Sequence, residues 1–363
     1  MGEEERIKEL EDLISNSQYN KRTQHAIGLY KAQLAKLKEK IEKKQTGTGG
    51  GGEGYAVRKT GDGTVLLLGF PSVGKSTLLN RLTNQDSEIG SYDFTTLDVV
   101  PGLLEYKHAK IQILDVPGVV QGAASGKGRG KEVLSVVRSA DLVINLLDVH
   151  NPEHKEVLQK EIRDAHIRVN EKKPDVKIKK KAKDGISIAS TVKLDINKQT
   201  LKDVLKEFRM MNADVVIRDK ITVDQFIDCI EANKKYIPGI TVVNKKDTVS
   251  KKRLKEVMKK TQADLAISAQ EEDGLEELKE LIFKKLDLIR IYMKEPRKDA
   301  DMEEPLIIKR RSTIKNICEK LHKDMVKNFR FARVTGPSAK FPEQKLSLPH
   351  TVKDKDIVEL HME

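Results

Sequence analysis

A glycine-rich string at residues 69–76 combines the residue types that a phosphate-binding loop needs. Gly69, Gly74, Lys75 and Ser76 stand in the spacing Gly-x-x-x-x-Gly-Lys-Ser, after an apolar run and before a segment that predicts a helix. Glycines let backbone N–H groups approach an anion closely, and a helix N-terminus adds its positive dipole end. The pattern therefore predicts a phosphate-binding loop. Its other members are Pro71, Ser72, Val73 and Thr77.

Two later segments could complete a metal and phosphate site around this loop. Lys75 can neutralise the terminal phosphates of a nucleotide, and the Ser76 hydroxyl is a Mg²⁺ ligand type. The string 93–97, DFTTL, follows in a polar stretch. Asp115 ends an apolar run and begins the string Asp-Val-Pro-Gly, in which the Gly118 N–H can sense a γ-phosphate. The predicted residues of the polar stretch are Phe94, Thr95 and Thr96.

Two roles beyond nucleotide binding are predicted for these positions. Ser76, Thr96 and Asp115 are the predicted metal ligands, with Thr96 joining when the γ-phosphate is present. Lys75, Thr96 and Gly118 are the residues expected to act on the phosphate that is transferred. The order of the three segments, each near the end of a predicted strand, favours this interpretation over ordinary loops.

The string Asn244-Lys245-Lys246-Asp247 selects the base. A carboxylate at Asp247 can accept hydrogen bonds from N1–H and the 2-amino group of guanine, whereas adenine has no 2-amino group and presents N1 as an acceptor. Asn244 is expected to support the phosphate loop, and the Lys245 stem to cover the base. A backbone N–H of a second loop could bind guanine O6. That loop is Ser268, Ala269 and Gln270.

No glutamine directly follows Gly118, where a water-positioning glutamine stands in Ras-like enzymes. Val119 takes that place, and Gln121 comes third after the glycine. Slow intrinsic hydrolysis is the resulting hypothesis. Two supplements stay open, a K⁺ ion at the phosphate loop or a residue that switch motion or a partner supplies. Cation-dependent relatives carry Asn where this chain has Ser72, which weakens the K⁺ hypothesis.

Other reactive residues carry less information. His150 and His154 have helical spacing, but no further metal ligand accompanies them, so a solvated helix start is the favoured interpretation. Cys229 and Cys318 lie in separate predicted helices and are interpreted as small apolar residues without a disulfide.

The nucleotide motifs lie in a predicted α/β domain. Six apolar strands separated by helices suggest a doubly wound, mostly parallel sheet with helices on both faces. The predicted strands are 64–69, 102–106, 110–115, 141–148, 239–244 and 263–268. Two helices are expected beside the later strands, at 152–169 and at about 274–292. This domain is assigned to residues 63–169 and 236–292.

Three further parts surround the sheet domain. Apolar residues at helical spacing predict a helical hairpin in residues 1–50, and the glycine-rich stretch 51–62 is a linker. The interval before strand 239–244 is longer than the about 30 to 40 residues that one helix and two loops need. It predicts an inserted α/β module at 170–235, with strands 175–180, 185–191 and 213–218 and helices starting at Thr200 and Thr222.

The C-terminal residues 293–363 predict a small sheet around one helix. The predicted strands lie at 305–310, 329–336 and 357–362, and the helix at 313–326.

Composition limits the class of partner. The formal net charge is +12, concentrated in lysine-rich strings at 36–44, 176–183 and 307–315, which fits a polyanion or a solvated surface. No apolar run approaches the roughly 20 residues of a bilayer span, and the charged N-terminus is unlike a signal peptide. We expect a cytoplasmic protein with no membrane partner, and no DNA partner is expected.

The motifs together resemble those of the developmentally regulated GTP-binding (DRG) proteins, in the Obg-related class of translation-factor-like GTPases. The strings that carry the resemblance are GFPSVGKSTLLNRLT, YDFTTLDVVPG, LDVPGVVQGAASGKGRGKEVLS and NKKD. The resemblance covers nearly the whole chain. It implies an N-terminal helical hairpin, an insertion similar to a ribosomal-protein domain, and a C-terminal β-grasp (TGS) domain. A hydrophobic residue at the place of Val119 is also a family trait.

For function, the resemblance implies a GTP-binding and GTP-hydrolysing switch that uses Mg²⁺. It also implies association with ribosomes or RNA in translation, with relief of slowed ribosomes as one role, and a dedicated stabilising partner protein in eukaryotic members. Two alternatives stay open. One is an RNA-binding or scaffold protein in which GTP or GDP is mainly structural; the other is an Obg-like ATPase, which Asp247 disfavours.

Overall fold

The chain divides into two compact units in the computed structural model. One, here called the central unit, consists of Tyr55–Ala165 and Ile237–Glu363. The other, here called the composite unit, combines Met1–Gly54 with His166–Tyr236. Both are therefore assembled from segments far apart in the sequence. The structure describes residues 2–18, 20, 23–45, 61–83, 100–115 and 140–362.

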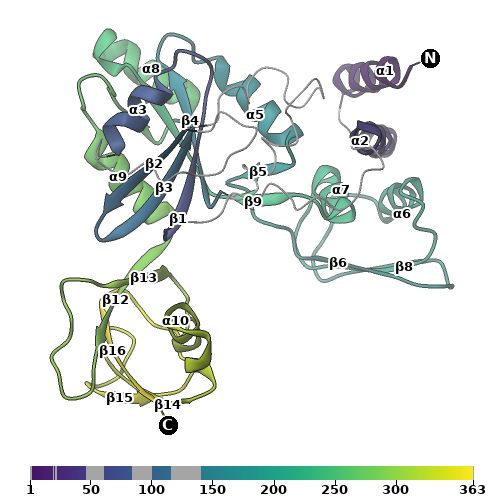
Figure 1. The fold of residues 1–363 in the computed structure, drawn as a ribbon. Coiled ribbons are helices and arrows are strands. Elements are labelled where there is room, and N and C mark those ends of the chain that lie inside the picture. Colours follow the sequence, from purple (N-terminus) through teal and green to yellow (C-terminus); the bar gives the residue numbers. More distant parts are fainter. Residues whose placement is uncertain are drawn as a thin grey trace. The chain divides into compact units, whose positions relative to one another are not determined.

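The central unit contains a six-stranded sheet (Figure 1), with the strand order β11-β10-β4-β1-β3-β2. Neighbouring strands pair in parallel, except that β2 is antiparallel to β3. This arrangement confirms the predicted doubly wound α/β fold, with an antiparallel strand at one edge. The strands are β1 (Gly63–Leu68), β2 (Val100–Tyr106), β3 (Ala109–Asp115), β4 (Leu142–Asp148), β10 (Gly239–Asn244) and β11 (Leu265–Ala266).

Both faces of this sheet are buried. On one face, leucines of α3 (Lys75–Leu82) and α9 (Leu275–Lys285) pack with Val65 and Leu67 of β1. The alternate β1 residues, Leu66 and Leu68, are buried as well. Helices α5 (His154–Asp164) and α8 (Lys251–Thr261) add further buried side chains, among them Leu158 and Val257. Burial on two faces explains why the strands are almost continuously apolar in the sequence.

The inserted module forms a three-stranded sheet in the order β6-β8-β7, covered on one face by two helices. Strand β8 (Ala213–Ile217) is antiparallel to β6 (Val176–Lys180) and parallel to β7 (Ile186–Ser190). Helices α6 (Lys198–Glu207) and α7 (Val223–Glu231) close the core above the sheet. The three predicted strands and both predicted helices are present, although α6 begins two residues before its predicted start.

The N-terminal hairpin shares a core with this module. Helix α1 (Glu3–Asn16) pairs with α2 (Gln24–Gln45) through the ion pairs Lys38–Glu11 and Lys40–Glu3. In turn, Ala32 of α2 is fully buried among the apolar side chains of α6 and α7. A Cβ at Gly28 would lie 2.9 Å from Thr200 Cγ2, so α2 approaches the module closely. The hairpin and the insertion, which the sequence suggested as separate parts, pack into one unit.

Two predicted helices end earlier than expected. Helix α5 stops at Asp164, and the residues after it form β5 (Ile167–Val169), which pairs with β9 (Lys235–Ile237). Helix α9 stops at Lys285, and β12 (Leu288–Lys294) follows. The expected helical ends 165–169 and 286–292 are therefore wrong, because strand pairing overrides the helical spacing of their apolar residues.

The start of α6 also differs from the prediction. It begins at Lys198 rather than at Thr200, because the Asn197 side chain accepts a hydrogen bond from the Gln199 N–H and caps the helix. Thr222 caps α7 as predicted, in a capping box with Gln225.

The C-terminal sheet has five strands in the order β13-β12-β16-β14-β15, packed against α10 (Ile314–Leu321). Its core includes Ile291, Ile317, Cys318 and Val358. A short η3 turn (Lys323–Val326) follows α10, where the sequence predicted a longer helix. The remaining strands are β13 (Leu306–Lys309), β14 (Phe329–Thr335), β15 (Gln344–Leu346) and β16 (Asp356–Met362).

Two smaller expectations can be compared with the structure. Cys229 on α7 and Cys318 on α10 are both free thiols, as predicted. In the described part of the chain, every helix is too short or too polar to cross a bilayer.

Candidate functional site

The predicted phosphate loop lies between β1 and α3, and its geometry requires glycine at two places. A Cβ at Gly69 would lie 2.6 Å from the Leu146 carbonyl oxygen. Gly74 has a φ of +94°, and a Cβ there would lie 2.5 Å from Asn244 Nδ2. Ser72 also has a positive φ, of 62°. The loop is therefore a tight backbone turn of the kind that presents N–H groups to an anion.

A cation and a helix N-terminus meet in this loop. Lys75 is the first residue of α3, and its Nζ donates hydrogen bonds to the carbonyl oxygens of Gly69 (3.1 Å) and Phe70 (3.2 Å). The N-cap residue of α3 is Gly74, which brings no side chain to the first helical N–H groups. The positive end of the helix dipole and the lysine charge thus lie within one turn of chain, which suits phosphate oxygens.

A buried carboxylate lies beside the first turn of α3. Asp115, at the end of β3, is 4% exposed, and its Oδ2 accepts a hydrogen bond of 3.1 Å from the Ser76 hydroxyl. Its other oxygen, Oδ1, is buried without a hydrogen-bond partner among the described residues. Burial raises the pKa of Asp115, although the Lys75 charge and the Ser76 hydrogen bond act in the opposite direction.

These oxygens fit a magnesium ion. Mg²⁺ prefers oxygen ligands and is held in such sites by one or two protein groups together with phosphate oxygens and water. An unpaired buried carboxylate oxygen next to a hydroxyl offers that donor set. Ser76 and Asp115 are thus brought together as the sequence predicted.

The Asn244 side chain ties the phosphate loop to a second loop. It is 2% exposed; its Nδ2 donates to the Val73 carbonyl oxygen (2.9 Å), and its Oδ1 accepts from the Ala269 N–H (3.0 Å). Both ends of the amide are therefore satisfied by backbone groups of different segments. This arrangement holds the ends of β1, β10 and β11 in register around one buried side chain.

Lys245 extends from the same strand end across the phosphate loop. Its Nζ donates to the Ser72 carbonyl oxygen (2.9 Å) and to Asp148 Oδ2 (2.7 Å). Asp148, at the end of β4, is 6% exposed and also accepts from the His150 N–H (2.9 Å). Burial alone would raise the pKa of Asp148, but the Lys245 hydrogen bond and the His150 N–H outweigh it and lower that pKa.

The predicted base-binding residues lie at adjoining strand ends. Asp247 is exposed in the η2 turn (Lys246–Thr248), directly after β10. Lys246 N donates to the Ile267 carbonyl oxygen (3.1 Å), which brings this turn next to the loop after β11. In that loop Ser268 and Ala269 are buried, whereas Gln270 is exposed. The structure therefore brings both base-binding segments together.

Several predicted site residues lie outside the described residues. They are Phe94, Thr95, Thr96 and Gly118, and the same holds for Val119 and Gln121. Pro71 and Thr77 are described and are exposed on the phosphate loop and on the first turn of α3.

The two histidines after β4 have other contacts than a metal. The Nε2 atom of His150 lies 2.8 Å from Thr248 Oγ1. The His154 ring stacks on Phe70 of the phosphate loop, with ring centroids 4.0 Å apart. Among the described residues, no third histidine, cysteine or acidic residue joins them to form a metal cluster.

Two features of the site were not predicted. Asp148 was not assigned a role, although it follows a buried apolar strand in the same way as Asp115 does, and this signal could have marked it. The stacking of Phe70 on His154 has no local sequence signal, because the two residues are 84 positions apart.

Three protein-family models match the chain. Residues 64–181 match the model described as 50S ribosome-binding GTPase, and residues 183–288 match the one described as C-terminal region of MMR_HSR1 domain. Residues 289–362 match the TGS domain.

Proteins similar over nearly their whole length include archaeal and eukaryotic GTP-binding proteins. An uncharacterized GTP-binding protein of Methanocaldococcus jannaschii is 51% identical, over 99% of this chain and 92% of its own. Ribosome-interacting GTPase 1 of Saccharomyces cerevisiae is 42% identical, over 98% and 97%. Developmentally-regulated GTP-binding protein 1 of Xenopus laevis is 41% identical, over 98% of each chain.

The substitution Asn244→Ala tests the connection between the two loops. It leaves the Val73 carbonyl and the Ala269 N–H unpaired, and each unpaired buried polar group costs about 1–3 kcal/mol. We expect the free energy of unfolding of the full chain, measured by urea denaturation, to fall by roughly 2–6 kcal/mol. The exposed Asn80 on α3 is the matched control, and Asn80→Ala should change it by less than about 0.5 kcal/mol. Equal effects of the two substitutions would contradict the bridging role.

Proposed function

Because the chain belongs to the family of developmentally regulated GTP-binding proteins, we propose that it is a GTP-hydrolysing switch that acts on ribosomes or RNA in translation. The observation that carries this proposal is the buried Asn244 amide, which joins the phosphate loop to the loop after β11. Such a connection fixes the two loops relative to each other, which suits a ligand that occupies both. A guanine nucleotide, with a base and a phosphate chain, is that ligand.

In the proposed complex, the loop 69–77 holds the phosphate chain. Its backbone N–H groups, the α3 N-terminus and the Lys75 ammonium supply positive charge to the phosphate oxygens. Ser76 and Asp115 would hold Mg²⁺, whose charge would offset that of the γ-phosphate oxygens. Thr96 and Gly118 remain the proposed sensors of the γ-phosphate. These roles rest on the donor set at the end of β3 and on the motif spacing.

The base is proposed to lie against the Lys245 stem, between the two loops that Asn244 connects. Asp247 accepts from N1–H and the 2-amino group of guanine. The Ala269 N–H already donates to Asn244, which leaves the Gln270 N–H as the donor for guanine O6. Asp148 supports this arrangement because it fixes the Lys245 ammonium against the phosphate loop.

The role of Asp247 predicts an exchange of base preference. In Asp247→Asn, an amide N–H₂ replaces one carboxylate oxygen and can donate to the 2-oxo group of xanthine. Each lost charge-assisted hydrogen bond is worth about 1.5–3 kcal/mol, so the GDP affinity should fall by roughly 10-fold to 150-fold. Xanthosine diphosphate should bind more tightly to the variant than to the wild-type chain, in calorimetric titration. An unchanged GDP affinity would exclude Asp247 from the base site.

Hydrolysis is proposed to be slow without an activator. The alkyl side chain of Val119 cannot orient a water molecule, in contrast to the glutamine of Ras-like enzymes. A K⁺ ion near the α-, β- and γ-phosphates is one proposed supplement, although Ser72 stands where cation-dependent relatives carry Asn.

The K⁺ proposal has a direct measurement. We expect GTP turnover in KCl to exceed turnover in NaCl at equal ionic strength, because Na⁺ is smaller and holds its water more tightly. A second titration with inert choline chloride controls for ionic strength. Equal turnover in the two salts would remove K⁺ and leave a partner-supplied group as the activator.

The ribosome is proposed as a partner on two grounds, the similarity to a ribosome-interacting relative and the exposed lysines of β6. A relative 42% identical to this chain is named for its interaction with ribosomes. The lysine-rich string 176–183 begins on β6, whose Lys177 and Lys179 are exposed on the sheet face that no described helix covers. Such charges favour an RNA backbone. The cytoplasm is the proposed location, and a dedicated stabilising partner protein and a role in relief of slowed ribosomes are proposed as well.

Co-sedimentation with ribosomes tests the switch itself. We expect the chain to pellet with ribosomes more strongly with a non-hydrolysable GTP analogue than with GDP, and ribosomes to accelerate GTP turnover. Lys75→Ala, which removes the ammonium from the phosphate loop, should abolish the difference between the two nucleotides. Equal binding in both states without acceleration would support the scaffold alternative, in which the nucleotide is structural.

A further inference from the structure

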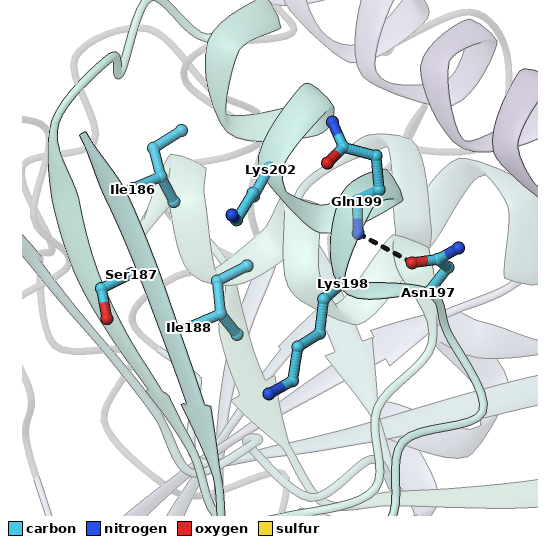
Figure 2. A pocket seen from close by; sticks show the side chains of 7 residues that line it. All are labelled: Ile186, Ser187, Ile188, Asn197, Lys198, Gln199 and Lys202. Atoms are coloured by element: carbon cyan, nitrogen blue, oxygen red, sulfur yellow. Dashed lines mark hydrogen bonds between the residues drawn. The ribbon is translucent and has the colours of Figure 1, made fainter.

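A groove lies beside an open sheet edge in the composite unit, far along the chain from the nucleotide motifs. It has a volume of about 560 Å³, within the range of natural ligand sites. Figure 2 shows the side chains of Ile186 and Ile188 on one wall and those of Lys198 and Lys202 on the other. The walls are strand β7 and the first turns of α6; Ser187, Asn197 and Gln199 complete the lining.

Strand β7 is at the edge of its sheet, and half of its backbone groups point outward. The Ala213 N–H donates to Gly185 O, and the Thr191 N–H donates to Ile217 O. Bonds in a parallel ladder involve every second residue, so the odd-numbered residues of β7 bind β8. The N–H and C=O groups of Ile186 and Ile188 therefore face away from β8, and no described strand pairs with them.

The two edges of this sheet differ in protection. The opposite edge strand, β6, reads VKIKK and carries three lysines, a usual device against pairing with foreign strands. Strand β7 reads ISIAS, without a charge or a proline. An uncharged, unpaired edge of this kind is where an extended peptide can add a strand.

The charge of the groove indicates which peptide fits. Lys198 and Lys202 are one helical turn apart on α6, and within the described chain neither has an acidic side chain in ion-pair contact. Acidic side chains at every second position of an added strand would face these two lysines. Their neighbours in the added strand would point to the opposite face of the sheet, beside the exposed Ser187 and Ala189, because strand side chains alternate in direction.

We propose that β7 and α6 form a docking groove for an extended acidic segment of a partner protein, which pairs with the backbone of Ile186 and Ile188 while its carboxylates contact Lys198 and Lys202. The groove residues belong to the composite unit, whereas the nucleotide motifs belong to the central unit. This proposal does not rest on the proposed function, so failure of either proposal leaves the other intact.

The probe is a capped eight-residue peptide in which glutamate alternates with valine, titrated into the full chain and followed by amide NMR shifts and hydrogen exchange. We expect binding, with slowed exchange of the outward Ile186 and Ile188 amides. The same peptide with lysine in place of glutamate should bind at least 10-fold more weakly. A peptide that binds without protection of β7 would overturn the proposal.

Two sets of variants separate backbone pairing from charge. Ile188→Pro removes an outward N–H without touching the β8 ladder, and should lower the peptide affinity at least 10-fold. Ile188→Val keeps that N–H and should bind like the wild type. The double variant Lys198→Glu, Lys202→Glu should prefer the lysine peptide, a reversal that a merely unfolded module could not show. Lys220→Glu, outside the groove, is its charge control.

RNA is the alternative ligand of the groove and is tested in the same way. If a single-stranded RNA oligonucleotide protects the β7 amides and the acidic peptide does not, the groove binds nucleic acid and the peptide proposal is wrong. Unchanged preference for the glutamate peptide in the double variant would also reject it.

Discussion

The buried amide of Asn244 is the constraint around which the central unit is arranged. Its side chain donates to a carbonyl oxygen in the turn after β1 and accepts from an N–H in the turn after β11. A movement of either turn alone would break one of these hydrogen bonds. The amide also explains a local peculiarity, because Gly74 must lack a side chain to make room for the amide nitrogen. Packing of β1, β4, β10 and β11 as parallel strands brings the turns after β1 and β11 to one edge of the sheet, where the amide at the end of β10 can reach both.

Two buried aspartates at this edge have pKa values shifted in opposite directions. Asp148 has a lysine ammonium at 2.7 Å, and its pKa is lowered. Among the described residues, Asp115 has only a hydroxyl as a direct partner and one oxygen without a hydrogen bond, and its pKa is raised. A satisfied carboxylate fixes protein groups in place, whereas an unsatisfied one is suited to a ligand that arrives later.

Local sequence signals predicted the central sheet and which described residues of the proposed site come together, because each strand is a buried apolar run and each loop has a distinct composition. They did not predict where two helices give way to strands. His166 and Asp287 take left-handed backbone conformations, with φ of 62° and 56°, without a glycine to signal the turn. Pairing with distant strands decides those ends. The packing of α2 on α6 and α7, and the contact of Lys245 with Asp148, depend on tertiary structure in the same way.

The composite unit has a consequence for the newborn chain. Lys36 of α2 contacts Glu207, 171 positions later, so α1 and α2 leave the ribosome well before their packing partners are made. At about 5–20 residues per second, the delay is roughly 10 to 35 s. During this time the side of α2 that packs on α6 and α7 is uncovered, and contacts of such sequence separation form slowly. Helices α1 and α2 are thus synthesised well before the segments that bury them.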